Sequence, residues 1–153
     1  MATSMVTGGT SGIGREFVTQ LAARGDDIVI VARDTERMAA IKADVEARYG
    51  VSVETIAADL SRREDVDQIT TRVEDPNHPV DLLVNNAGFA VHAKILDPEA
   101  LELHDRAVEV MMRAVLVLSA AAGRAMKARG HGAILNLSSS CLLYTSDAAD
   151  DLL

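Results

Sequence analysis

The feature that most constrains the fold is an uninterrupted apolar run in the first quarter of the chain. Residues 27–32 read DIVIVA, with four β-branched side chains in a row. Strands of this composition are covered on both faces, and this happens mainly in parallel sheets whose crossover helices lie on either side. The run therefore predicts a buried parallel strand in an α/β domain.

The remaining apolar segments fit the same sheet. Strands are expected at residues 5–7, 51–57, 80–84 and 133–137, and segments with helical spacing separate them. Gly25 and Gly50 stand where the first two helices would end, and Asp34 stands where the second would begin. Five strands alternating with four helices predict a doubly wound parallel sheet with right-handed crossovers, ending after the fifth strand.

The last of these helices is expected from residue 98 to residue 129. Its apolar stripe is expected at i, i+3 and i+4 steps, formed by Val108, Met111, Met112, Val115, Ser119 and Ala122. Met111 and Met112 are therefore interpreted as core or helix-interface residues.

Composition excludes several classes of protein. The chain has 153 residues, 48% of them hydrophobic, which suits one globular domain. Its formal net charge of −8 argues against binding nucleic acid or an anionic membrane surface. No apolar stretch approaches the roughly 20 residues of a membrane span. A single cysteine and no signal-like N-terminus predict a reducing, cytoplasmic location.

A glycine-rich loop carries the binding chemistry. Residues 7–14 read TGGTSGIG, between the first expected strand and the first expected helix. Glycines let a pyrophosphate approach the free N–H groups at a helix N-terminus, because no Cβ blocks the way. The strand on one side and the helix on the other make this a dinucleotide-binding fingerprint rather than a simple tight turn.

The spacing Gly8-x3-Gly12-x-Gly14 resembles that of the short-chain dehydrogenase/reductase family. Three more segments strengthen the resemblance, which covers residues 1–140: Asp59-Leu60, residues 85–88 (NNAG) and residues 136–139 (NLSS). It implies a Rossmann fold. It also implies that Asp59 bonds the adenine, although Asp59 could instead cap the next helix. The implied cofactor-binding residues are Gly8, Thr10, Ser11, Gly12, Ile13, Gly14, Arg33, Asp59, Leu60, Asn86, Ala87 and Gly88.

Arg33 bears on the choice of cofactor. It follows the second strand, where an acidic residue would bond the ribose 2′-hydroxyl of NAD. A guanidinium suits a 2′-phosphate instead, so NADP is expected to be preferred over NAD. The alternative is a surface arginine paired with Asp34 or Glu36.

The resemblance also implies hydride transfer between the nicotinamide and a carbonyl or alcohol, using a serine, a tyrosine, a lysine and an asparagine. Ser139 matches the serine, whereas Met111 stands at the asparagine position. The tyrosine would fall at Asp151 or Leu152, and no lysine follows Lys127. Tyr144 is followed four residues later by alanine. The chain as written is therefore predicted to be inactive.

The C-terminal residues explain this gap. Residues 141–151 back-translate to what looks like a transposase sequencing adapter read in frame. Residues 1–140 are then an incomplete NAD(P)-binding domain, and residues 141–153 are a non-native tail. The alternative is a natural, acidic and disordered tail.

Three functions follow. The first is an NADP-dependent oxidoreductase that acts on a small carbonyl or alcohol and forms a homo-oligomer in its full-length form. The second is a non-catalytic nucleotide-binding module. The third, a sugar-nucleotide epimerase, is disfavoured by the glycine spacing.

His92 and Lys94 could touch substrate or lie in a solvated loop. The histidines show no metal-ligand spacing, so no metal is expected.

Overall fold

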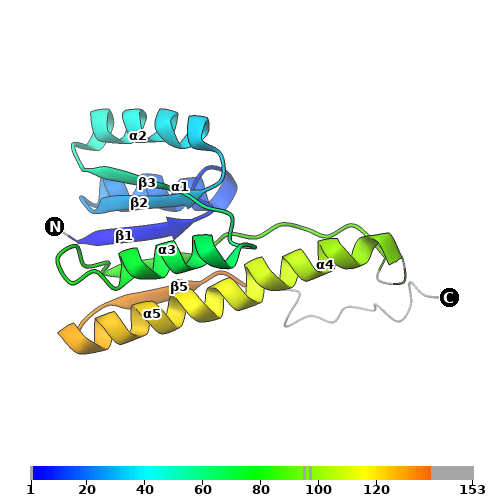
Figure 1. Ribbon diagram of the computed structural model, residues 1–153. Coiled ribbons are helices and arrows are strands. Elements are labelled where there is room, and N and C mark those ends of the chain that lie inside the picture. Colours follow the sequence, from blue (N-terminus) through cyan, green and yellow to red (C-terminus); the bar gives the residue numbers. More distant parts are fainter. Residues whose placement is uncertain (1, 95, 97, 139–153) are drawn as a thin grey trace.

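The computed structural model describes residues 2–94, 96 and 98–138. Its five-stranded sheet is parallel throughout, in the order β3-β2-β1-β4-β5 (Figure 1). The strands are β1 (Thr3–Thr7), β2 (Asp27–Ala32), β3 (Val53–Ala57), β4 (Leu82–Asn85) and β5 (Ala133–Asn136). The predicted doubly wound parallel sheet is confirmed, and β2 has the predicted bounds.

Helices cover both faces of this sheet. The helical elements are α1 (Gly12–Ala23), α2 (Thr35–Tyr49), α3 (Arg63–Val73), the 3-10 turn η1 (Pro98–Ala100), α4 (Leu101–Val108), the π-turn η2 (Glu109–Arg113) and α5 (Ala114–Arg129). The helices α1 and α2 pack on one face, and α3 and α5 pack on the other. As predicted, Asp34 caps α2 and Gly50 ends it.

The strand β2 shows why its sequence is apolar throughout. Its four central residues are each no more than 1% exposed. Val29 and Val31 belong to the core on the α3 and α5 side, whereas Ile28 and Ile30 belong to the core under α1 and α2. Side chains alternate between the two faces of a strand, so both sets must be apolar when helices cover both faces.

The long final helix is interrupted, and its buried face differs from the predicted one. Met111, Met112 and Val108 are 41%, 66% and 51% exposed, so Met111 and Met112 are not core residues, and their alternative place at a helix interface stays a prediction. The buried residues are Ala107, Val110, Ala114, Leu118, Ala121, Ala122 and Met126. The helix is apolar almost continuously over residues 114–122, and the π-turn shifts the helical phase, so periodicity alone did not select the buried face.

The strand β5 lies at the edge of the described sheet. It pairs with β4, and within residues 2–94, 96 and 98–138 no strand pairs with its other side. All four of its residues are exposed, with Ile134 at 36% and Leu135 at 38%. Among the helices described here, none is long and apolar enough to span a membrane.

Candidate functional site

The loop after β1 opens onto the N-terminus of α1. Gly8 and Gly12 have φ angles of +68° and +50°, a region that side chains with a Cβ rarely adopt. The N-cap residue Ser11 makes no side-chain cap bond, and the first turn of α1 holds no acidic residue. At α2, by contrast, Asp34 caps the first turn, which also contains Glu36. The positive end of α1 is therefore free to receive an anion.

Gly14 holds this loop close to the sheet. A Cβ at Gly14 would overlap the carbonyl oxygen of Gly8 and the side-chain amide of Asn86. That amide donates to the carbonyl oxygens of Thr7, at 2.9 Å, and Gly8, at 3.2 Å. The loop and the end of β4 are thus joined through a contact that only glycine permits.

A second set of polar contacts joins the ends of β4 and β5. The side-chain amide of Asn85 donates to Ser119 Oγ of α5 at 3.1 Å and to Asn136 Oδ1 of β5 at 2.8 Å. Asn85 is only 4% exposed. Buried polar groups are stable only when they are bonded, so these bonds fix the carboxyl ends of the two strands together.

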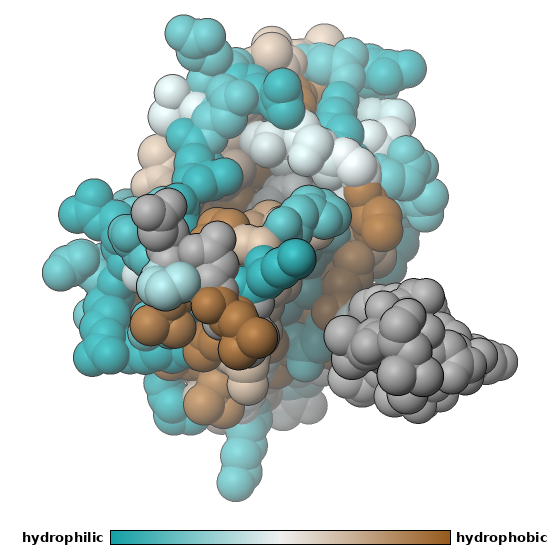
Figure 2. Space-filling view, turned by 90° about the vertical axis from the view of Figure 1, so that its right-hand side faces the viewer, coloured by the Kyte–Doolittle hydropathy of each residue, from teal (hydrophilic) through white to brown (hydrophobic). Residues whose placement is uncertain are grey.

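A cleft of about 680 Å³ lies over the carboxyl ends of the strands, within the range of roughly 300–1,000 Å³ that ligand sites occupy. Figure 2 looks onto this edge of the molecule. Ten of the twelve residues that the sequence assigned to a cofactor line it: Gly8, Thr10, Ser11, Ile13, Arg33, Asp59, Leu60, Asn86, Ala87 and Gly88. The other two, Gly12 and Gly14, are not among the lining residues, although both start α1 beside them.

Two arginines stand at the end of β2. Arg33 lines the cleft and is exposed, and Arg37 lines it from the first turn of α2. Asp34 pairs with Arg37, its Oδ2 lying 3.6 Å from Nε. Within the described part of the chain, Arg33 forms no salt bridge, so the alternative pairing with Asp34 or Glu36 is not observed. Sequence reasoning missed Arg37, although its position three residues after the expected N-cap Asp34 puts it in the first turn of the helix that begins beside Arg33.

Asp59 lies at the other side of the cleft and is held by three donors. Its Oδ1 accepts from the Ser61 backbone at 3.0 Å and from the Ser61 hydroxyl at 2.7 Å. Its Oδ2 accepts from Arg106 Nη2 at 2.7 Å. Burial alone would raise the pKa of Asp59, but the Ser61 bonds and the charges of Arg106 and Arg33 lower it below its usual value.

Arg106 was not singled out from the sequence. It comes from α4, 47 residues after Asp59, and it lines the same cleft. No local pattern connects two positions so far apart, so the ion pair could be found only in the folded chain.

The catalytic positions are described only in part. Ser139, Cys141 and Tyr144 lie outside the described residues. Met111 lies in η2, and its Sδ would be 3.3 Å from a Cβ added at Gly88, which lines the cleft. The thioether therefore lies beside Gly88, although Met111 is not itself among the residues that line the cleft.

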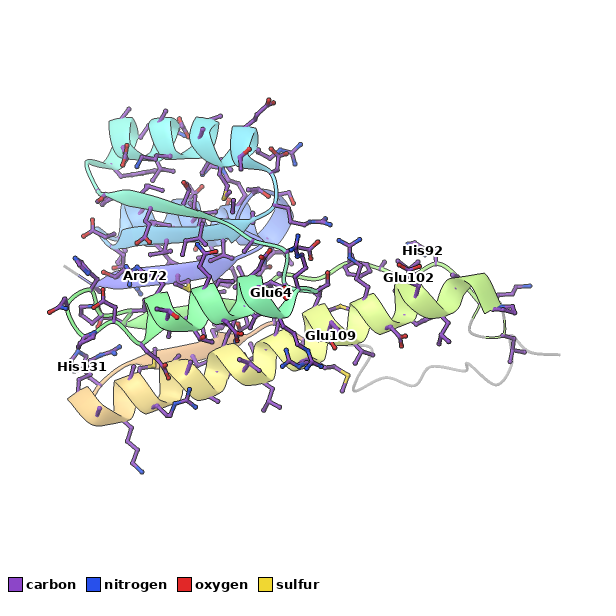
Figure 3. All side chains as sticks on the ribbon, in the orientation of Figure 1. Glu64, Arg72, His92, Glu102, Glu109 and His131 are labelled. Carbon is purple, nitrogen blue, oxygen red and sulfur yellow. The ribbon has the colours of Figure 1, made fainter. Side chains whose placement is uncertain are left out.

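His92 and Lys94 are exposed, and neither lines the cleft. Figure 3 shows His92 in the segment beside α4, whereas His131 lies at the opposite end of the molecule. The alternative in which they touch substrate thus has no support from the residues that line the described cleft, and it stays untested.

Comparisons with known proteins agree with this geometry. The sequence model of the family described as short chain dehydrogenase matches residues 2–148. A short chain dehydrogenase of Pseudocercospora fijiensis is 35% identical over 145 residues, which cover 94% of this chain and 47% of the relative. The chain therefore spans about half the length of the curated relatives that it matches.

Two solved structures share the fold closely. The bulky-bulky ketone specific alcohol dehydrogenase from Comamonas testosteroni superimposes with a TM-score of 0.88 at 30% identity, covering 95% of this chain and 57% of the other. A short-chain dehydrogenase from Sphingobium yanoikuyae, solved in complex with NADPH, gives a TM-score of 0.84 at 33% identity, with coverages of 91% and 54%.

The fold and the glycine loop define a Rossmann-type α/β domain. The family match and the order of the four motifs identify the family within this class of fold. The chain belongs to the short-chain dehydrogenase family.

Proposed function

We propose that this chain is the cofactor-binding part of an NADP(H)-dependent oxidoreductase. In the whole protein, hydride would pass between the nicotinamide and a small-molecule carbonyl or alcohol. The relatives are named as dehydrogenases and reductases, and one neighbouring structure was solved with NADPH. These names describe those proteins, and they support the assignment of the same class of reaction here.

The observation that carries the proposal is the combination of an uncapped helix N-terminus with two arginines around one cleft. The pyrophosphate of a dinucleotide fits the first turn of α1, because its N–H groups meet no acidic side chain and no capping side chain. Gly8 and Ser11 line the same part of the cleft. The residues present are therefore suited to a dinucleotide.

The arginines favour the phosphorylated form of the cofactor. Arg33 and Arg37 place two permanent positive charges beside the end of β2, where a ribose 2′-substituent would lie in this fold. Asp34 partly offsets Arg37 but leaves Arg33 without an acidic partner among the described residues. We therefore propose NADP(H) as the preferred cofactor.

Met111 supports a second candidate. A thioether accepts hydrogen bonds only weakly, so at this position it cannot hold a relay water as an asparagine amide would. A nucleotide-binding module without turnover is therefore an alternative to an active reductase. Met111 alone supports this alternative, because the positions of a Tyr-x-x-x-Lys sequence fall in or beyond residues 141–153, which are predicted to be a non-native tail.

The test is to titrate the chain with NADPH and then to follow NADPH oxidation with a panel of ketones and aldehydes. Saturable binding without turnover is expected, because general acid catalysis contributes about 10²–10⁴ in rate and no tuned proton donor is present. Failure to bind any nicotinamide dinucleotide would overturn the proposal. Turnover that disappears in a Tyr144→Phe variant would show that the tail is native and catalytic.

A further inference from the structure

The Arg106–Asp59 pair extends the site from the sheet to a helix that projects beyond it. In Figure 1, α4 runs out past the carboxyl ends of the strands. Among the described elements, its substantial contacts are with η1 and η2, its neighbours in the chain. The bond from Arg106 Nη2 to Asp59 Oδ2 therefore joins α4 to the loop after β3, across the wall of the cleft.

The hydrogen bonds leave Asp59 with limited acceptor capacity. A carboxylate offers about four acceptor positions, two on each oxygen. Two are used on Oδ1 by the Ser61 amide and hydroxyl, and one is used on Oδ2 by Arg106. The position that remains is on Oδ2, beside Arg106, and Asp59 is one of the residues that line the cleft.

We propose that Arg106 is a positioning residue for the base of the bound nucleotide, because its ion pair holds the Asp59 carboxylate in place to accept a hydrogen bond from an exocyclic amino group. This inference rests on the proposed nucleotide-binding function. It concerns which base the cleft prefers, a property that binding of the pyrophosphate and ribose does not require.

Ser61 and two arginines lower the pKa of Asp59, and Arg106 is the one of these arginines that contacts the carboxylate directly. The charged groups that face Asp59 are Arg106 from α4, Arg33 from the end of β2 and Asp65 from α3, whose carboxylate accepts the Asp59 backbone N–H at 2.7 Å. Asp65 opposes the negative form of Asp59, and burial opposes it too. Removing Arg106 leaves only the Ser61 bonds and the charge of Arg33 to lower the pKa of Asp59.

The proposed hydrogen bond to Asp59 can be tested by comparing dinucleotides whose bases differ in the amino group. Adenine carries an amino group, which donates to a carboxylate, whereas hypoxanthine carries a carbonyl oxygen there, which a carboxylate repels. NADH and reduced nicotinamide hypoxanthine dinucleotide differ only in the base, at C6 and in the hydrogen that hypoxanthine carries on the neighbouring N1. Neither has a 2′-phosphate, so that group does not enter the comparison.

The experiment measures the affinity of the chain for both dinucleotides, in the parent and in Arg106→Gln, near pH 7, where Asp59 is ionised. The parent is expected to prefer NADH roughly tenfold, as for one hydrogen bond to a charged group. Arg106→Gln is expected to lose most of this preference.

Arg113→Gln is the matched control, since it removes an arginine from η2 that pairs with Glu109 at 3.7 Å and does not line the cleft. Arg113→Gln should keep the parental preference. Arg106→Lys, which retains the charge, should restore part of the preference and carries the test if Arg106→Gln does not fold. An unchanged preference in both Arg106 variants overturns the inference. A parent chain that binds neither dinucleotide overturns the proposed function first, and the inference with it.

Discussion

Thr7 and Asn86 are joined through both their backbones and their side chains. The backbone N–H of Asn86 donates to the Thr7 hydroxyl at 3.0 Å, and the Asn86 side-chain amide donates to the Thr7 carbonyl oxygen at 2.9 Å. The Thr7 hydroxyl also accepts from the backbone N–H of Ala87 at 3.1 Å. One threonine and one asparagine therefore fix the end of β1 and its glycine loop against the end of β4.

The first prediction follows from these bonds. Asn86→Ala removes the donor to the Thr7 and Gly8 carbonyl oxygens and leaves both part-buried acceptors without this partner. The free energy of unfolding should fall by about 1–3 kcal/mol. Urea unfolding measures this fall. Gln68→Ala, at an exposed position of α3, is the control and should change stability by less than about 0.5 kcal/mol. Equal effects of the two substitutions would contradict the role assigned to Asn86.

The second prediction compares two helical glycines. Gly14→Ala places a methyl group against the Gly8 carbonyl oxygen and the Asn86 amide, whereas Gly123→Ala in α5 meets nothing within 4 Å. Gly14→Ala should destabilise the fold by at least about 1–3 kcal/mol through overpacking. Gly123→Ala should be neutral or stabilising by up to about 1 kcal/mol, because alanine favours the helix. Thermal unfolding of the two variants measures both effects, and a tolerated alanine at position 14 would show that the loop can relax.

The third prediction concerns the 2′-phosphate. Arg33→Ala should reduce the preference for NADPH over NADH by about 1–3 kcal/mol, because one charge-assisted contact is lost. Arg37→Ala should have a smaller effect, since Asp34 already pairs with that guanidinium. Titrations of both cofactors against each variant give the preference. Arg63→Ala, at an exposed position that does not line the cleft, should leave it unchanged. Equal affinities of the parent for the two cofactors would contradict NADP preference.

The fourth prediction concerns acid stability. Burial would raise the pKa of Asp26, but the bonds from Arg24 and Ser4 outweigh it and lower the pKa below its usual value. The folded state therefore gains stability from Asp26 above about pH 4 and loses it as the pH falls through the lowered pKa. Asp26→Asn should lower the free energy of unfolding at neutral pH by about 1–3 kcal/mol and reduce its acid dependence. Denaturant unfolding across the acid range tests this, with Asp67→Asn at an exposed position of α3 as the control.

The fifth prediction concerns self-association. The open edge of β5 and the exposed Met112 and Leu116, which are 66% and 70% exposed, present apolar surface that soluble monomers rarely leave uncovered. The chain by itself is expected to aggregate or to melt without cooperativity. Light scattering and calorimetry measure this. A monodisperse monomer with a sharp melt would contradict it, and recovery of such a melt in a longer chain that continues past Ser140 would support it.

The sequence by itself determined the class of fold and most of the candidate site. Residues 27–32 are apolar because both faces of β2 are covered. This apolar run is a local feature of the sequence, so it predicts a buried strand without any knowledge of the packing. The glycine loop is equally local, because backbone conformation and the start of a helix are set by neighbours in the chain. Ten predicted residues consequently meet at one cleft.

Only the tertiary structure decided the buried face of the last helix and the partner of Asp59. The helix is apolar on several sides, so its orientation depends on which side α3 and the sheet cover, and Val110 rather than Met111 became the buried residue. Arg106 reaches Asp59 from 47 residues away. Contacts of this kind are set by how separate elements pack, which the spacing of residues within one element does not record.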